Sequence, residues 1–461
     1  MSAWQPPGLD VAGMDLAGME EVRPCLEGLV PSIMATVAPD GTPNVAYLSQ
    51  VYPVDDDHVA LSFQFFNKTR QNLQANPRST VLVLHPFTAR YYRFHLRFER
   101  TEAQGPVFER MKAQLAGIAS HEGMAEVFRL RGADIHRVLA IERLPPSPPP
   151  ESAVSLPPPP ARPDALALLR RSSRRLGEAC SLDALLRAAL DTLADEWGIR
   201  HAMVLIHDAA SARLYTLASH GYARSGVGSE IAVGDGVVGV AARERVPIRI
   251  NHMTTAQRYN HAMRQGAGEP LGDHIPYPGL PQPRSQLAVP LLSVNRLVGV
   301  LFVESDEDMR FSGEDEDLLV ALGGHLAAGI DLMREADAPC ADTLPPAPVP
   351  RPPALEPLRV RRFRRDDSVF VNNAYLIKGV AGAILWRLLN DHEAGRRDFT
   401  NRELRLDSSL GLPDVSDNLE ARLLLLQRRL AEQCPLLVLR KTGRGCLRFE
   451  AGAPLVLEDV A

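Results

Sequence analysis

Short apolar runs separated by turn residues dominate the first 145 residues of the chain. The runs read PSIMATVAP, PNVAYLSQVYPV, HVALSFQFF, STVLVLHP and YYRFHLRFERTE, and a turn signal at Asp40-Gly41 follows the first. Alternation of apolar and polar positions over such lengths predicts an antiparallel β-barrel or sandwich. Residues 106–132 instead show helical spacing, and their apolar stripe is expected to belong to the core. It consists of Phe108, Met111, Leu115 and Ile118.

The pattern changes after residue 164. A long helical run precedes short strands in HAMVLIHD, ARLYTLASHGY and VPIRIN. Residues 284–308 predict two apolar strands joined by a turn at Asn295-Arg296, and an acidic segment then begins a final helix. One stripe of that helix is predicted to form a core or dimer seam and holds Leu318, Leu322, Leu326 and Ile330.

Residues 358–450 predict strands, three helices and a basic hairpin. The strands lie in RVRRFRRDDSVFVNNAYLI, the last helix in SDNLEARLLLLQRRLAEQC and the hairpin in LLVLRKTGRGCLRFE. Thr400 with Glu403 predicts one capping box, and Asp417 with Glu420 predicts a second. The fold class predicted for the whole chain is multidomain α+β.

Two proline-rich stretches separate these parts. Residues 145–163 and 339–357 hold 18 of the 38 prolines, and the interior of a helix or sheet does not tolerate such a density. They predict semi-rigid spacers, in agreement with the roughly three domains expected at this length. The predicted order is domain 1–144, linker 145–163, domain 164–336, linker 337–357 and domain 358–461.

Charge and cysteine usage narrow the classes of function. The chain carries a net charge of −5, yet residues 358–449 hold 18 Lys/Arg against 11 Asp/Glu, a balance of +7 that favours a polyanion partner at this end. The five cysteines lack the spacing of a zinc site or disulfide framework. We see neither an export signal nor a run of roughly 18 apolar residues, so a cytoplasmic protein without membrane segments is predicted.

The strand order, the segment NKTRQNLQANPR at 67–78 and the acidic-aromatic strand after it resemble the FMN-binding split barrels of the pyridoxamine-phosphate-oxidase-like class. The resemblance covers about 120 residues. It implies a homodimeric barrel with FMN at the dimer interface, its phosphate held by the polar turn and its ring along residues 46–50. An empty dimerisation barrel is the alternative. The implied FMN contacts are Tyr47, Ser49, Asn67, Lys68, Thr69, Arg70 and Asn72.

The run VGDGVVGVAARE, together with the apolar hairpin and the final acid-started helix of the second part, resembles a GAF domain. This implies an α/β sensory domain whose pocket lies between the sheet and a covering loop, here residues 251–283. The loop carries no cysteine to attach a bilin, and the cyclic-nucleotide motif is missing, so the ligand stays open. Its histidines match no ligand spacing and are interpreted as surface residues: His252, His261 and His274.

The third part resembles the winged-helix output domains of bacterial response regulators over about 90 residues. The resemblance implies that the third helix enters the DNA major groove with its outer face and that the hairpin contacts phosphates. The implied DNA contacts are Asn418, Arg422, Arg429, Lys441 and Arg444. Leu425 on the same helix face, and Cys446 where the family prefers tyrosine, leave open a winged helix used for protein contacts.

The sequence shows no serine-histidine-acid set, paired carboxylates, phosphate loop or metal-ligand cluster, so no catalytic or metal-binding residue is predicted. Any reaction would belong to a bound flavin. We therefore predict a sensory transcriptional regulator: the barrel and GAF domain sense a small molecule or redox state, and a dimer reports by binding DNA. The alternatives are an FMN-dependent oxidoreductase with regulatory modules and a non-catalytic protein-interaction scaffold.

Overall fold

The fold is given by a computed structural model of the chain. Contacts divide it into two compact units, of which the first comprises residues 1–162 with 246–257 and 308–310, and the second comprises the rest. The structure describes residues 11–27, 31–63, 68–86, 88–122, 130–145, 164–251, 275–335, 356–410, 412, 419–443 and 445–460.

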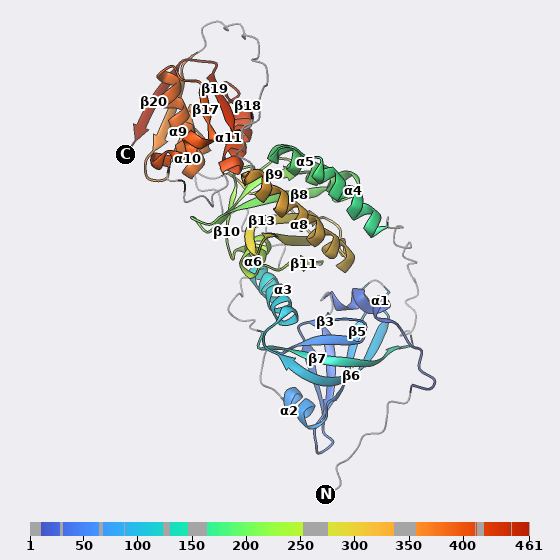
Figure 1. The fold of residues 1–461 in the computed structure, drawn as a ribbon. Coiled ribbons are helices and arrows are strands. Elements are labelled where there is room, and N and C mark those ends of the chain that lie inside the picture. The colour runs from blue at the N-terminus through green and yellow to red at the C-terminus, as the bar shows by residue number, and fades with distance from the viewer. Residues whose placement is uncertain are drawn as a thin grey trace. The chain divides into compact units, whose positions relative to one another are not determined.

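The strands of the first unit's barrel form one curled antiparallel sheet in the order β2-β1-β5-β6-β7-β4-β3 (Figure 1). The run PNVAYLSQVYPV, predicted as a single strand, forms both β2 and β3. Because these two strands stand at opposite ends of this order, the chain bends between them. At the bend the backbone N–H of Gln50 donates to the Ser62 hydroxyl at 3.1 Å. The elements are α1 (Met19–Val22), η1 (Arg23–Leu26), β1 (Ser32–Val37), β2 (Pro43–Leu48), β3 (Val51–Pro53), β4 (His58–Phe63), α2 (Lys68–Ala75), β5 (Arg78–Leu84), β6 (Tyr91–Glu102), α3 (Pro106–Glu122) and β7 (Gly132–Arg143).

Alternating burial along the strands forms the core of this barrel. Val81 and Val83 of β5 are buried while their neighbours are partly exposed, as a half-buried strand requires. A second cluster joins α3 to the sheet and contains Phe108, Met111 and Leu115, which confirms the predicted core stripe for these three residues.

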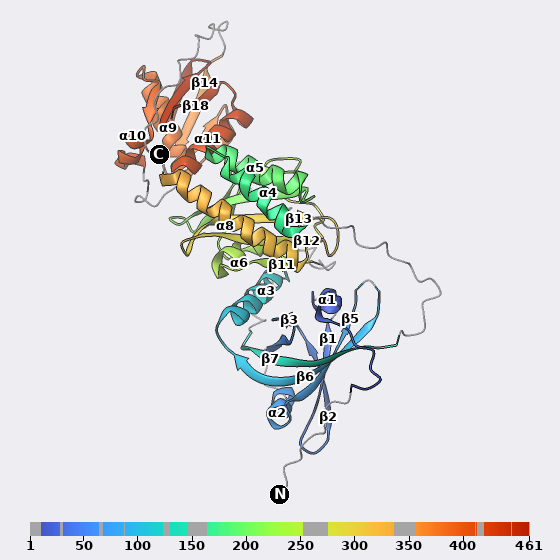
Figure 2. The ribbon, with the colours of Figure 1, turned by 45° about the vertical axis from the view of Figure 1, so that its right-hand side comes forward.

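A sheet with the order β10-β9-β8-β13-β12-β11 organises residues 201–305. The long helical run divides into two helices, and the Ser181 hydroxyl caps the second by accepting from the Ala184 N–H at 3.2 Å. Helices α4, α5 and α8 lie side by side along the sheet (Figure 2). The elements are α4 (Ala165–Gly177), α5 (Leu182–Asp195), β8 (His201–Asp208), β9 (Arg213–His220), β10 (Glu230–Ala232), α6 (Gly236–Glu244), β11 (Ile248–Ile250), β12 (Ser285–Ser293), β13 (Arg296–Ser305) and α8 (Gly313–Glu335).

Two details of this region test the sequence patterns. Leu322, Leu326 and Ile330 of α8 are fully buried, and half-buried Leu318 packs against their cluster, which confirms the stripe. The turn between β12 and β13 lies one residue earlier than predicted. It is formed by Val294 and Asn295 at φ 45° and 60°, and a two-residue turn with both residues left-handed matches the twist of its strands.

The C-terminal part contains a four-stranded sheet, β16-β15-β14-β20, and a three-stranded sheet, β17-β19-β18. The Thr400–Glu403 capping box is confirmed at the start of α10, whereas Asp417 lies outside the described residues. The winged-helix identification stays a prediction. The elements are β14 (Leu358–Phe363), β15 (Ser368–Val371), β16 (Ala374–Ile377), α9 (Gly379–Glu393), β17 (Asp398–Thr400), α10 (Asn401–Leu406), η2 (Ser408–Leu410), α11 (Leu419–Gln433), β18 (Leu437–Gly443), β19 (Cys446–Ala451) and β20 (Leu455–Val460).

One hydrophobic cluster runs through the second unit and includes residues of both predicted modules, from Leu168 to Ala453. The two modules therefore share buried apolar contacts, although a proline-rich stretch separates them in sequence. In the described parts of the chain, no helix is long and apolar enough to span a membrane.

Candidate functional site

Two neighbouring cavities in the barrel share Tyr47, Leu48 and Ser49 among their lining residues. The smaller has a volume of about 100 Å³, and the larger, of about 510 Å³, extends toward Cys25 and Gln50. The Tyr47 side chain is 79% exposed on β2. The structure therefore brings Tyr47 of β2, and Ser49 just after this strand, to the walls of both cavities.

The helix α2 begins with the predicted residue Lys68, which is exposed. Thr69 and Asn72 are buried and bonded within the fold. The amide of Asn44 donates to the Thr69 hydroxyl at 2.9 Å, and the Asn72 amide donates to the Thr36 hydroxyl at 3.1 Å. These bonds hold α2 against β1 and β2, which leaves Lys68 as the exposed cation at its start. Asn67 lies outside the described residues.

Arg70 lies in the wall of the smaller cavity and is engaged by neighbours. Its guanidinium is 3.1 Å from the Asp134 carboxylate, donates to the Thr101 hydroxyl at 3.1 Å, and lies 4.1 Å from the centre of the Phe63 ring. Thr101 also donates to Asp134 at 2.5 Å. The positive charge of Arg70 is therefore largely balanced by Asp134, and a phosphate would have to share it.

His136 is a site residue that the sequence patterns did not indicate. It is fully buried in the wall of the smaller cavity, and its Nδ1 donates to the Asp134 carbonyl at 2.9 Å. Burial lowers its pKa, so the ring is neutral and Nε2 carries an acceptor lone pair. Nε2 has no hydrogen-bond partner in the described part of the protein. Because His136 lines the smaller cavity, we treat this acceptor without a partner as a candidate contact for a ligand donor.

A buried polar group lies in the second module. Glu304 of β13 is 1% exposed and accepts from the Leu280 N–H at 2.8 Å and from the Gln286 amide at 3.1 Å. Burial raises the pKa of Glu304 to about 7. Burial also raises the pKa values of Tyr222 and Tyr277 well above their ordinary value, and the charge of nearby Glu304 adds to both shifts. The three histidines of the covering loop lie outside the described residues.

The expectation that Arg422 and Arg429 face outward from α11 is wrong for this structure, since they are 7% and 5% exposed. Arg422 is 2.9 Å from Asp208 of β8. Arg429 donates to the Leu376 carbonyl at 3.0 Å, and burial lowers its pKa. Periodicity alone misplaces these residues, because Asp208 and Leu376, which hold them in the interior, are distant from them in sequence. Their role in DNA binding stays a prediction.

The basic hairpin of the C-terminal part is tied to α11. Lys441 of β18 pairs with Glu420, which also accepts from the Asn401 amide at 2.6 Å. Lys441 is still partly exposed, unlike the arginines of α11. Asn418 and Arg444 lie outside the described residues. In the part of the chain that the structure describes, no group of three or more His, Cys, Asp and Glu side chains is placed to hold a metal ion.

Comparison with known families supports two of the modules. Residues 19–140 match the family model described as pyridoxamine 5'-phosphate oxidase, and residues 179–331 match that of the GAF domain. The split-barrel and GAF identifications are therefore confirmed, and together they indicate a sensory or FMN-related protein. No curated protein matches the chain.

Several solved structures resemble single parts of the chain. The GAF domain of an Acinetobacter phosphoenolpyruvate-protein phosphotransferase has 22% identity and a TM-score of 0.31, covering 37% of this chain and 95% of that one. Free methionine-R-sulfoxide reductase from Neisseria meningitidis has 22% identity and a TM-score of 0.30, with coverages of 37% and 91%. An FMN-binding protein from Syntrophomonas wolfei has 18% identity and a TM-score of 0.24, with coverages of 28% and 86%.

Proposed function

We propose that this protein is a sensory regulator. Its split barrel binds FMN, its GAF domain takes a small molecule, and its C-terminal domain binds DNA. The observation that carries the flavin assignment is the pair of cavities meeting at Tyr47 and Ser49, in a barrel matched by the oxidase family model and beside a helix that begins with exposed Lys68. Placement in the cytoplasm belongs to the same proposal.

The residues around these cavities fit FMN. Lys68, next to the lining residue Thr69, would supply a cation for the phosphate, and Nε2 of His136 would supply an acceptor for a ring N–H. Arg70 has a positioning role, because its pair with Asp134 ties α2 to β7. FMN, when bound, provides the redox chemistry through which such a protein responds to reductants or oxidants.

Titration of the full-length protein with FMN tests the flavin assignment. Binding is measured by the quenching of flavin fluorescence. Lys68→Ala is expected to weaken FMN binding by about tenfold or more, because one charge-assisted phosphate contact is lost. Lys112→Ala removes an exposed lysine of α3 paired with Glu109 and is the matched control. Equal affinity of both variants would count against the phosphate site. Turnover of NAD(P)H by the flavin-loaded protein would instead favour the oxidoreductase.

Exposed apolar side chains on the edge of the barrel support a homodimer. Val45 and Tyr47 of the edge strand β2 are 67% and 79% exposed, and Val37 of the paired strand β1 is also exposed. Unpaired strand edges with apolar side chains are sites of association. Sedimentation of Tyr47→Asp should show a shift from dimer toward monomer, and an unchanged dimer would place the interface elsewhere.

The positive balance of residues 358–449 supports DNA as the partner of the C-terminal domain. Two winged helices on a dimer would suit a two-fold operator. Fluorescence anisotropy with a DNA duplex at increasing salt is the test, since neutralised phosphates make affinity fall linearly with salt on logarithmic axes. Lys441→Ala should reduce that slope. If neither the wild type nor Asp208→Asn, the variant described below that loosens α11, binds DNA at low salt, the proposal that the C-terminal domain binds DNA fails.

A further inference from the structure

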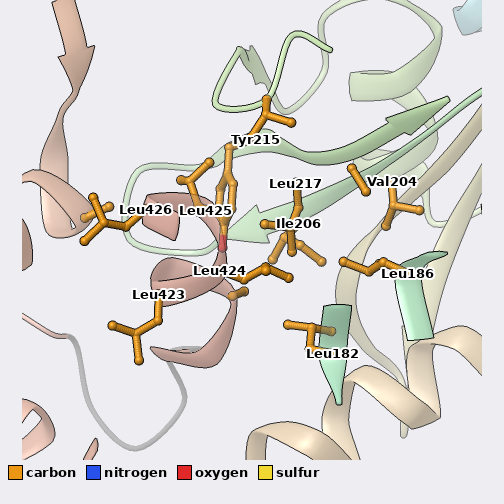
Figure 3. Packing of buried hydrophobic residues seen from close by; sticks show 14 of the residues in the cluster. Leu182, Leu186, Val204, Ile206, Tyr215, Leu217, Leu423, Leu424, Leu425 and Leu426 are labelled. Carbon is orange, nitrogen blue, oxygen red and sulfur yellow. The ribbon is translucent and has the colours of Figure 1, made fainter. Parts of the chain in front are cut away.

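Helix α11 is buried on nearly all sides within the second unit. Leu424 and Leu425 point toward Tyr215, Ile206 and Leu217 of the GAF domain, whereas Leu423 and Leu426 project from the other side of the helix (Figure 3). Four consecutive leucines of α11, residues 423–426, are buried, so apolar side chains cover more than one side of the helix. One side of α11 therefore packs on its own domain, and the other side packs on the GAF domain.

Charges on the two domains complement each other around these leucines. Arg422 is 2.9 Å from Asp208, and its guanidinium lies 4.8 Å from the centre of the Tyr215 ring. Arg428 donates to the Asp183 carboxylate at 2.7 Å and to the Leu217 carbonyl at 2.6 Å. Lys378 and Glu230 form a third pair, at 3.2 Å.

The pair formed by Arg422 is largely removed from water. Both partners are buried to a similar degree, with side-chain exposures of 8% for Arg422 and 16% for Asp208. Burial opposes ionisation of Asp208, but the charge and hydrogen bond of Arg422, together with hydrogen bonds from Ser211 and Ala210, hold the pKa of Asp208 below its ordinary value. Loss of one partner leaves a buried charge without compensation, which destabilises such a contact strongly.

We infer that the GAF surface formed by Asp183, Asp208, Tyr215 and Leu217 is a docking surface for α11, and that docking and DNA binding exclude each other. The exclusion rests on the proposed DNA-binding function. Arg422 is only 7% exposed while it holds Asp208, so a base or phosphate cannot reach its guanidinium until α11 leaves the GAF surface. The docked arrangement is thus closed to DNA, and release of α11 opens it.

The chain between β9 and β10 links this surface to the buried polar group of the GAF domain. The Ser225 hydroxyl donates to Glu432 of α11 at 2.7 Å, and Gly228 lies against Leu425. Tyr222 of the same segment is close to Glu304. A molecule that displaces Tyr222 therefore acts on the same short segment of backbone that holds α11.

Asp208→Asn in the full-length protein tests the docking surface. It removes the charge that holds Arg422 but keeps the side-chain oxygen that accepts from the Ala210 N–H at 3.1 Å. Asp183→Asn removes the charge that pairs with Arg428, and it serves as a second docking variant if Asp208→Asn folds poorly. The control is Asp306→Asn, which changes an exposed acid elsewhere in the GAF domain. Hydroxyl-radical footprinting of Tyr215 and Leu425 measures docking, and anisotropy with a DNA duplex at fixed low salt measures affinity.

Both docking variants are expected to increase the labelling of Tyr215 and Leu425 several-fold and to tighten DNA binding by about tenfold, while the control changes neither. Unchanged labelling in both variants overturns the docking surface. Increased labelling with tighter DNA binding supports both parts of the inference. Increased labelling in a protein that binds no DNA keeps the docking surface, overturns the exclusion, and counts against the proposed DNA-binding function itself.

Discussion

Replacing Glu304 with glutamine is expected to remove a pH dependence from the stability of the GAF domain. The carboxyl group is 1% exposed, and burial raises its pKa from 4.5 to about 7. The folded state therefore keeps a proton between these values that the unfolded state has lost. The stabilisation is fully present below pH 4.5 and disappears as the pH rises through 7.

The size of the effect follows from the shift. A difference of about 2.5 pKa units corresponds to roughly 3 kcal/mol in the free energy of unfolding between pH 4.5 and pH 8. Glutamine keeps the shape of the side chain and can still accept from the Leu280 N–H, but it carries no titrating proton. The variant should therefore lose the slope that the wild-type protein shows in this window.

The change of the unfolding free energy with pH is measured by urea unfolding at pH 5 and pH 8, with tryptophan fluorescence as the signal. Trp197 belongs to the same hydrophobic cluster as the helices of the GAF domain and reports its unfolding. The relevant quantity is the difference between wild type and Glu304→Gln at each pH, because other titrating groups cancel. Glu307→Gln, an exposed neighbour, is the control. Identical slopes for the wild type and Glu304→Gln would refute the reasoning.

Three further predictions test the fold. Gly221→Ala should destabilise the GAF domain by about 2 kcal/mol or more, because the residue has φ +86° and a Cβ would lie 1.9 Å from the Arg200 carbonyl; Gly177→Ala, with open space around it, should be close to neutral in thermal unfolding. Thr400→Ala removes the cap of α10 and should lower the free energy of unfolding in urea by about 1 kcal/mol. An unchanged free energy would mean that this helix end is already frayed. Leu326→Ala should cost about 2–5 kcal/mol, and a smaller loss would mean that the core collapses around the cavity.

Local patterns in the sequence predicted elements well where their causes are local. The Thr400–Glu403 box depends on residues three apart, and the leucine stripe of α8 depends on helical spacing, so both were visible in the sequence. The sequence places the turn after β12 one residue too late, because Asn295 carries the strongest turn signal there. The second position of the left-handed pair is Asn295, and the first is Val294, which carries no turn signal.

The candidate sites were harder to predict because they depend on partners distant in sequence. Arg70 was expected to donate to a phosphate, yet Asp134 lies beside it across the barrel. His136 gave no signal, since an unpartnered Nε2 is a property of its surroundings. The helical spacing of Arg422 predicts an exposed side chain, but in the structure it is buried and pairs with Asp208 of the GAF domain. Such contacts become visible only when the chain is folded.

The absorbance spectrum of the purified full-length protein, recorded before and after denaturation, tests the central claim most directly. The account predicts a flavin spectrum and release of near-stoichiometric FMN on denaturation, because we propose that the hollow at Tyr47, with Lys68 and His136, binds the flavin. A colourless protein that stays free of flavin after incubation with FMN and gel filtration would contradict it.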